Sequence, residues 1–357
     1  MCQITCDRVA FSLNAGNKRG YGAVGSALPW HGRGQGFESP YLHTIITNQG
    51  ALTMSVVASV PRGWDAKDIG DLTGQHFLIT GGTSGIGKET ARELARAGAH
   101  VTITARNPIK GANTVAEIGK DRVDFKILDL ADLSSVRAFA KDFTSPFDVL
   151  ILNAGVMATP FTLTKDNFEM QMGTNHLGHF ALAGLLHKQV KKRVVAVSSQ
   201  MHRTARISGA TIDDLRDKAK GIGAYNAWTT YAVSKLANLL FIHELERRQL
   251  RNNWKIQAVA AHPGYADTNL VAGATVQDRA GAFANALFAQ SAQRGALPTL
   301  CAATFPGLIG ASYIGPDGFL EMRGFPKLTR AAAIAYDQRL AADLWTVSEE
   351  LTGVTWG

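Results

Sequence analysis

The sequence predicts an α/β protein with a single doubly wound, mostly parallel sheet of seven strands and helices on both faces. Two observations support this fold class. From Gln75 onward, strand-like apolar runs alternate with helix-like stretches through short connections, which is typical of a parallel sheet covered on both faces. The first run, Phe77-Leu78-Ile79, leads into a glycine-rich loop and then directly into a helical stretch. This order is the building unit of doubly wound sheets.

The composition agrees with one large folded region. The chain has 357 residues, of which 46% are hydrophobic and 18% are charged, which disfavours a disordered or coiled-coil protein. The formal net charge is +8, but Lys and Arg are scattered, so we expect no nucleic-acid partner. Apolar runs are too short for an integral membrane segment, and Cys2, Cys6 and Cys301 lack zinc spacing. We therefore expect a cytoplasmic protein without a metal.

The first part of the chain differs from the rest. Residues 1–53 are rich in Gly, Asn, His and Ser and lack helical or strand periodicity. They contain Gly20–Gly25, a formal G-x-G-x-x-G, but no strand precedes it and Pro29 ends any helix after it. We expect residues 1–53 to be a disordered extension, or a start assigned too early with initiation at Met54. Residues 54–357 would then form the domain.

The elements of this domain follow from the apolar pattern in chain order. Right-handed crossovers would join the strands into the doubly wound sheet. The expected strands are Phe77–Thr80, His100–Ala105, Asp124–Leu128, Val149–Leu152, Arg193–Val197, Ile256–Ala260 and Ser312–Ile314. The expected helices are Lys88–Ala97, Ile109–Ile118, Ser134–Phe143, Phe168–Leu186 and Thr230–Leu250.

The loop after the first strand is a candidate phosphate-binding site. Its glycines allow a pyrophosphate to approach the backbone, and the following helix N-terminus offers unpaired N–H groups and a partial positive charge. A plain strand–turn–helix connection is the alternative, because short glycine motifs are common. The candidate cofactor contacts here are Gly81, Thr83, Ser84, Gly85, Ile86 and Gly87.

Tyr231 and Lys235 form a candidate acid/base pair. Of the seven tyrosines, only Tyr231 has a lysine four residues later, and this spacing places both side chains on one face of a helix. A phenol titrates near pH ~10, too high for proton transfer at neutral pH. An ammonium group beside it favours the phenolate, so we expect Lys235 to lower the pKa of Tyr231. A surface helix is the alternative for this short pattern.

Together, the glycine loop and the Tyr/Lys pair resemble the short-chain dehydrogenase/reductase family, and further motifs follow in the family's order. Asn153-Ala154-Gly155 ends the fourth strand, like the NAG turn that borders the cofactor. Asn175 lies in the next helix, where the family uses an Asn to hold a water in a proton relay. Ser199, in preference to Ser198, matches the substrate-orienting hydroxyl. The turn beside the nicotinamide is matched by Pro263, Gly264 and Thr268.

Several longer runs are similar to retinol dehydrogenase-like and WW-domain oxidoreductase-like members of the family. The resemblance implies a Rossmann-type domain, and a homo-oligomer formed through the helix Thr230–Leu250 is common in the family. The runs are Gly85–Ala91, Thr174–Phe180, Tyr313–Gly318 and Ala342–Val354.

The end of the second strand predicts which nicotinamide cofactor is bound. An acidic residue there would bind the ribose 2′-OH and select NAD. The strand instead ends in Thr104-Ala105-Arg106-Asn107, and Arg106 can pair with a 2′-phosphate. We therefore expect NADP(H), with a solvated surface arginine as the alternative. Asp129-Leu130 matches the family position that borders adenine, with an ordinary turn Asp as the alternative.

The resemblance implies hydride transfer between the nicotinamide and a carbonyl or alcohol carbon. Tyr231 would be the general acid/base, Ser199 would bind the carbonyl oxygen, and Asn175 would maintain the relay. A lid over about 268–300, which includes Leu297 and Leu300, is rich in Ala, Leu, Val and Phe and indicates a lipophilic alcohol, aldehyde or ketone. The alternative is a catalytically silent, NADP(H)-sensing regulatory protein, which would not need all four catalytic side chains.

Three histidines raise the question of a metal site. His176, His179 and His187 share one predicted helix but lack carboxylate or cysteine partners at ligand spacing, so we expect packing or surface roles for them.

Overall fold

The computed structural model describes residues 59–265 and 290–356, except residues 208 and 210, and also the two strands over 42–46 and 52–56. The chain divides into two units, Met1–Ser39 and Pro40–Gly357, and all described residues lie in the second. The predicted contact Thr268 and the predicted lid residues 268–289 lie outside the described residues.

A two-stranded antiparallel sheet crosses the domain boundary that the sequence predicts. Strand β1 (Leu42–Ile46) pairs with β2 (Leu52–Val56), and Thr44 is the partner of Met54. Strand β1 and the first two residues of β2 thus lie within residues 1–53, where the sequence shows no strand periodicity, and the domain boundary at residue 54 stays a prediction. Both strands contain β-branched residues, which favour extended structure even where a run is too short to show a period.

The main sheet has eight strands in the order β10-β9-β8-β7-β6-β3-β4-β5. Neighbouring strands are parallel except β10, which pairs antiparallel with β9. The seven expected strands are all present within a few residues. The strands are β3 (His76–Ile79), β4 (His100–Ala105), β5 (Val123–Ile127), β6 (Phe147–Leu152), β7 (Val190–Val197), β8 (Gln257–Ala261), β9 (Tyr313–Pro316) and β10 (Pro326–Leu328).

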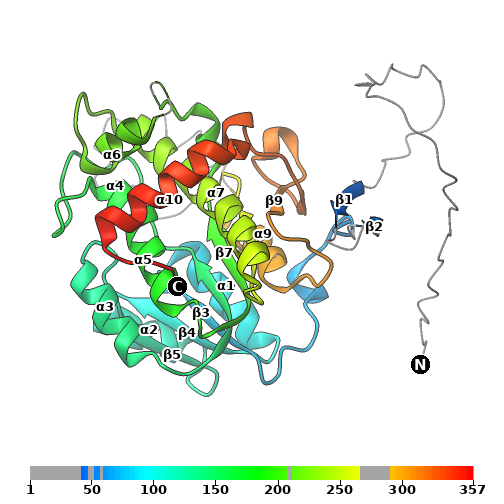
Figure 1. Ribbon diagram of the computed structural model, residues 1–357. Helices are drawn as coiled ribbons and strands as arrows, with labels where there is room; N and C mark the ends of the chain where they lie inside the picture. The colour runs from blue at the N-terminus through cyan, green and yellow to red at the C-terminus, as the bar shows by residue number, and fades with distance from the viewer. Residues whose placement is uncertain are drawn as a thin grey trace, which may run out of the picture. The chain divides into compact units, whose positions relative to one another are not determined.

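Helices cover both faces of this sheet (Figure 1). Leu78 and Leu150 point into one core with α3, α5, α7 and α10, while Phe77 and Ile151 point into a second core with α1 and α9. Alternate residues of a strand face opposite sides, so continuous apolar strands supply both cores. The helices are α1 (Gly85–Arg96), α2 (Pro108–Ile118), α3 (Leu133–Asp142), α4 (Met170–Met172), α5 (Gly178–Leu186), α6 (Ile212–Lys220), α7 (Ala227–Asn252), α9 (Ala292–Thr304) and α10 (Gln338–Thr352).

Helix α9 corrects the prediction of a lid that extends to residue 300. It begins at the N-cap Ser291 and packs against α1 and the sheet, although it contains Pro298. Leu297 and Leu300 are buried in the second core, with exposed fractions of 4% and 0%. Apolar composition alone did not distinguish a core helix from the lining of a substrate lid.

Strand β10 was missed because its sequence has little strand character. It is three residues long, begins with Pro326 and contains Lys327. Proline is tolerated at the start of an edge strand, where one side needs no hydrogen bond. Pairing with β9 is therefore decided by the tertiary contact and not by the local pattern.

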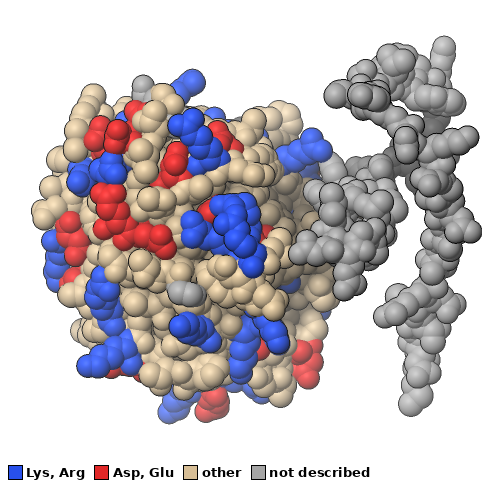
Figure 2. Space-filling model, in the orientation of Figure 1, with Lys and Arg blue, Asp and Glu red and all other residues tan. Residues whose placement is uncertain are grey.

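The surface of the molecule is of mixed charge. Figure 2 shows Lys and Arg side chains interspersed with Asp and Glu on the face that it draws. Several charged side chains of the described residues form ion pairs, such as Arg216 Nη2 with Glu350 Oε2 at 2.8 Å and Arg92 Nη2 with Glu117 Oε1 at 2.7 Å. Within the described ranges, no helix has the combination of length and apolar character that spanning a bilayer would require.

Candidate active site

A cleft of about 300 Å³ lies at the carboxyl ends of the central strands. Strand β3 lies between β4 and β6, so the strand order reverses here: β4 and β5 continue the sheet on one side of β3, and β6 and β7 continue it on the other. Ligands of doubly wound sheets bind at such a switch point. The lining includes fifteen of the predicted residues: Gly81, Thr83, Ser84, Gly85, Ile86, Gly87, Arg106, Asp129, Leu130, Asn153, Ala154, Gly155, Tyr231, Lys235 and Pro263.

Other residues of the cleft lining were not predicted. All but one of them follow or end the strands β4, β5, β6 and β7, so the rule that the ends of parallel strands meet at one edge could have found them. The exception is Thr174, which lies in a helical turn beside the predicted Asn175. The predicted residues Asn175, Ser199 and Gly264 lie just outside the lining. The additional lining residues are Thr104, Ala105, Leu128, Val156, Thr174, Val197 and Ser198.

The glycine loop approaches its neighbours so closely that a side chain would not fit. A Cβ on Gly87 would lie 2.3 Å from Gly81 O, and Gly81 has a φ of +68° with Ala154 Cα only 2.9 Å from where its Cβ would be. Helix α1 begins at Gly85, three residues before the predicted Lys88, so its first turn lines the cleft. The Ser84 side chain makes no capping hydrogen bond. The N–H groups of this turn therefore suit a pyrophosphate.

Thr80 joins the glycine loop to the turn after β6. Its hydroxyl oxygen accepts from the backbone N–H groups of Asn153 at 2.9 Å and Ala154 at 3.0 Å. The side-chain amide of Asn153 donates in return to Thr80 O at 2.9 Å and Gly81 O at 3.2 Å. These four bonds hold the two turns together on one side of the cleft.

Asn175 lies in a π-helical turn and not in the regular helix that the sequence predicts. The turn spans Gly173–Leu177, between α4 and α5. Asn175 Oδ1 accepts from Val156 N at 2.8 Å, and Nδ2 donates to Val156 O and Ser234 Oγ at 2.9 Å each. Single π-helical turns are frequent at functional sites, because the extra residue displaces a side chain from the regular helical position.

A buried polar chain continues from Asn175 to Thr80. His179 Nδ1 lies 3.0 Å from Asn175 O, and His179 Nε2 lies 2.8 Å from Thr80 Oγ1. Because a carbonyl oxygen only accepts, Nδ1 carries the proton and Nε2 accepts from the Thr80 hydroxyl. Burial lowers the pKa of His179 to about 3, which keeps this ring neutral. His179 therefore has a structural role, as expected, and connects the Asn175 backbone to the glycine loop.

Tyr231 and Lys235 lie on α7 and face the cleft together. Lys235 Nζ is 5.7 Å from the centroid of the Tyr231 ring and donates to Val197 O at 3.1 Å. Burial lowers the pKa of Lys235 to about 8. Burial also raises the pKa of Tyr231 to about 12, while the Ser199 hydroxyl beside the phenol acts in the opposite direction. The net shift of the Tyr231 pKa is therefore upward, opposite to the lowering that we expect from Lys235, because desolvation of the phenolate is the larger effect.

The two serines after β7 have different surroundings. Ser198 Oγ donates to Lys235 O at 2.8 Å and is buried, so its hydroxyl is occupied in holding α7 against the sheet. Ser199 Oγ accepts from Met201 N at 3.2 Å and caps the 3₁₀ helix Gln200–Thr204. In this bond the Ser199 hydroxyl is only an acceptor, so its proton can still be donated to a ligand beside Tyr231. This favours Ser199 over Ser198 as the substrate-orienting hydroxyl.

The opposite end of the cleft carries Arg106 and Asp129. Arg106 is exposed at the end of β4, and its guanidinium has no hydrogen bond or ion pair to any residue that the structure describes. Asp129 Oδ1 accepts from Ala131 N at 3.0 Å, so its carboxylate also holds the turn after β5. Within the described ranges no group of His, Cys, Asp and Glu could hold a metal ion.

Comparisons with known proteins agree with this arrangement. Residues 75–211 match the family described as short chain dehydrogenase. The chain is 37% identical over 294 residues to human retinol dehydrogenase 11, covering 79% of this chain and 87% of that protein. It is 35% identical over 295 residues to human polyprenol dehydrogenase, covering 78% and 84%. A crystal structure of an uncharacterized protein from Mycobacterium paratuberculosis is 42% identical, with a TM-score of 0.70 over 83% of this chain and 99% of that one.

The chain therefore belongs to the short-chain dehydrogenase/reductase family, and it is an NAD(P)-dependent oxidoreductase.

Proposed function

We propose that this enzyme uses NADP(H) and transfers hydride between the nicotinamide and the carbonyl or alcohol carbon of a lipophilic substrate. The observation that carries the proposal is that one cleft is lined by Arg106 at one end and by Tyr231 and Lys235 at the other, with the uncapped start of α1 between them.

The cofactor preference rests on the end of β4. Arg106 is exposed in the cleft and has no acidic partner among the described residues, so its fork of N–H donors is free for the oxygens of a 2′-phosphate. The residue after it is Asn107, whose side chain caps α2 by accepting from Lys110 N at 3.1 Å. The two residues that directly follow β4, Arg106 and Asn107, therefore include no carboxylate that would bind the ribose 2′-OH.

The chemistry rests on the groups around Tyr231. When bound, the cofactor supplies the hydride. In the reductive direction Tyr231 Oη donates a proton to the carbonyl oxygen, and the Ser199 hydroxyl stabilises the negative charge that develops there. The buried ammonium of Lys235 favours the phenolate that remains. Asn175, held by its three side-chain hydrogen bonds, maintains the proton relay behind this pair.

A lipophilic substrate is supported by the apolar surface near Tyr231. Trp228 lies one helical turn before Tyr231 on α7 and is 49% exposed, and Tyr265 follows the Pro263-Gly264 turn and is 44% exposed. Phe161, which packs edge-on against Tyr225, is also 49% exposed. Each of these side chains belongs to a segment that also supplies residues to the cleft or its border, and large exposed aromatic side chains on such segments favour an apolar ligand. The relatives named for retinol and polyprenol agree with this class.

The test is NADPH oxidation measured over a panel of retinal-like, steroid and aliphatic carbonyls. Tyr231→Phe should abolish turnover by the best substrate without preventing NADPH binding. Tyr336→Phe is the matched control, because this phenol is half exposed and accepts from Ala331 N at 3.0 Å away from the cleft. Full activity of Tyr231→Phe would refute the acid/base role, and NADPH binding without turnover of any carbonyl would favour a sensor.

A further inference from the structure

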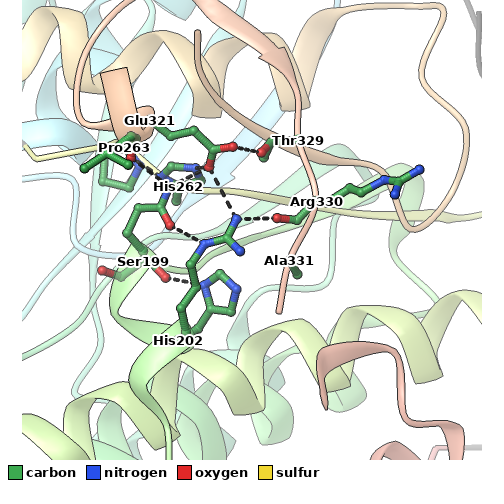
Figure 3. Close-up of polar contacts among 12 residues, drawn as sticks. Ser199, His202, His262, Pro263, Glu321, Thr329, Arg330 and Ala331 are labelled. Atoms are coloured by element: carbon green, nitrogen blue, oxygen red, sulfur yellow. Dashed lines mark hydrogen bonds and ion pairs between the residues drawn. The ribbon is translucent and has the colours of Figure 1, made fainter. Parts of the chain in front are cut away.

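The carboxylate of Glu321 accepts from donors on three other segments of the chain (Figure 3). Its Oε2 lies 2.5 Å from Gln200 Nε2 and 3.2 Å from His262 Nε2. Thr329 donates its hydroxyl to Oε1, and Arg203 Nη2 lies 3.6 Å from Oε2. Glu321 does not line the cleft, and its side chain is only 18% exposed. A carboxylate so fully engaged fixes the relative positions of these segments.

One arm of this network leads to the turn that borders the cleft. The backbone N–H of Gly264 donates to His262 Nδ1 at 3.2 Å. Because a backbone N–H only donates, Nδ1 has no proton, and the proton on Nε2 is donated to Glu321. The His262 side chain is 0% exposed, so it cannot contact a substrate. The ring is a rigid spacer between Glu321 and the Pro263-Gly264 turn, and Pro263 lines the cleft.

The second arm leads to Ser199. Gln200 follows Ser199 directly, and its amide oxygen accepts from Arg203 Nε at 2.7 Å while its amide nitrogen donates to Glu321. Arg203 Nη2 also donates to Arg330 O at 2.5 Å. The 3₁₀ helix that Ser199 caps is therefore tied to Glu321 at its first residue and to the segment after β10 at its fourth.

A second histidine holds the backbone of Ser199 from the other side. His202 Nδ1 donates to Ser199 O at 2.6 Å, and His202 Nε2 accepts from Ala332 N at 3.0 Å. This ring is also fully buried. His202 thus holds the carbonyl of Ser199, and Glu321 holds the side chain of Gln200, the next residue.

The backbone around Glu321 adopts a conformation that side chains rarely take. Leu320 has a φ of 47° and Glu321 a φ of 56°, both in the left-handed region. Such residues persist where the surrounding contacts over-determine them, and they are concentrated at functional sites. The bonds from Gln200, His262 and Thr329 are the contacts that hold Glu321 in this position.

We propose that Glu321 is a positioning residue for hydride transfer, which sets the distance between Ser199 and the Pro263-Gly264 turn across the ends of β7 and β8. The proposal rests on the function proposed above, because Ser199 there binds the carbonyl oxygen and the turn borders the nicotinamide. A displacement of roughly 1 Å between reacting groups can reduce the rate on the order of a hundredfold.

The test is a series of two substitutions at Glu321 with one control. Glu321→Ala removes every acceptor, whereas the amide oxygen of Glu321→Gln can still accept from His262 and Gln200. Glu350→Ala is the control, because its carboxylate pairs with Arg216 on the surface between α6 and α10. The measurements are kcat and KM with the carbonyl that the wild type reduces fastest, the Kd for NADPH, and the thermal unfolding midpoint.

The positioning role predicts that Glu321→Ala lowers kcat about tenfold to a hundredfold. The Kd for NADPH should stay within about threefold of wild type, and Glu321→Gln should recover most of the lost kcat. Three results would overturn the proposal. The first is a folded Glu321→Ala variant whose kcat is within about twofold of wild type, and the second is a loss of kcat that only follows a loss of NADPH binding or of folded protein. The third is a kcat of Glu321→Gln as low as that of Glu321→Ala.

A separate readout keeps this proposal distinct from the proposed function. If the wild type reduces no carbonyl of the panel, the proposed function fails, and the fluorescence anisotropy of bound NADPH then tests the positioning alone. A lower anisotropy in Glu321→Ala than in wild type would show that Glu321 restrains the nicotinamide end. Equal anisotropy would overturn the proposal.

Discussion

Replacing Asn175 with alanine should lower both the stability and the activity of the enzyme. The Asn175 side chain is 0% exposed and makes three hydrogen bonds, two to the Val156 backbone and one to Ser234 Oγ. Alanine removes the amide and leaves these partners in place. The Val156 N–H and C=O then lack a protein partner on the cleft side, and Ser234 Oγ keeps only its bond to Tyr231 O at 2.8 Å.

The magnitude follows from counting these bonds. Three hydrogen bonds at about 1 kcal/mol each would give about 3 kcal/mol. Val156 is half-buried beside the cleft, so water replaces part of its lost bonding. We therefore expect the free energy of unfolding to fall by about 2 kcal/mol. The kcat of the folded variant should fall as well. Asn175 donates to Ser234 Oγ, and Ser234 lies on the same turn of α7 as Tyr231, so the substitution disturbs the catalytic tyrosine.

Urea unfolding at neutral pH measures the stability, and kcat is measured on protein that remains folded. Asn113→Ala is the matched control, since this side chain is exposed on α2, and it should change the free energy of unfolding by less than about 0.5 kcal/mol. A decrease of less than about 1 kcal/mol for Asn175→Ala, together with unchanged kcat, would refute the reasoning from these hydrogen bonds.

Three further predictions test the cofactor, the acid sensitivity and the core. Arg106→Asp should shift the ratio of kcat/KM for NADPH over NADH towards NADH by about tenfold to a hundredfold, because charge-assisted bonds to a phosphate contribute about 1.5–3 kcal/mol. Lys110→Asp, on the helix α2 that follows Arg106, is the control, and an unchanged ratio for Arg106→Asp would contradict the assignment. Burial lowers the pKa of His176, His202 and His243 to about 4 and that of His179 to about 3, against an unfolded value of 6.5. Between pH 6.5 and about 4 the unfolded chain therefore binds more protons than the folded one, and the free energy of unfolding should fall steeply as the pH is lowered through this range. Above pH 6.5 these four histidines should have no effect on it. A free energy of unfolding that stays constant from pH 6.5 to about 4 in chemical denaturation would show that the rings are not buried in the neutral form. Leu300→Ala should lower the free energy of unfolding by about 2–5 kcal/mol, as expected for a fully buried leucine of α9, whereas a lid residue would alter KM with little effect on stability.

The core of the fold could be predicted from the sequence because its signals are local. The strands that form the centre of the sheet are continuous apolar runs, and β6 is buried along its whole length. The glycines of the loop after β3 are required because neighbouring turns come too close for a side chain. They can be recognised as a motif in the sequence because they lie close together in the chain. Elements with weak local signals, such as β10 with its Pro326 and α9 with its Pro298, were missed or assigned another role.

Local patterns in the chain predicted seven of the eight strands of the main sheet, the glycine loop, and the spacing of Tyr231 and Lys235 on one helical face, since each depends on residues close together in the sequence. Which of these residues share a cleft, the π-helical turn at Asn175, and the raised pKa of the buried Tyr231 all depend on the folded structure. The same is true of Glu321, which joins Ser199 to the turn at Pro263 through residues distant in sequence. Hydrogen bonds and desolvation depend on distances in three dimensions, and no periodicity along the chain encodes them.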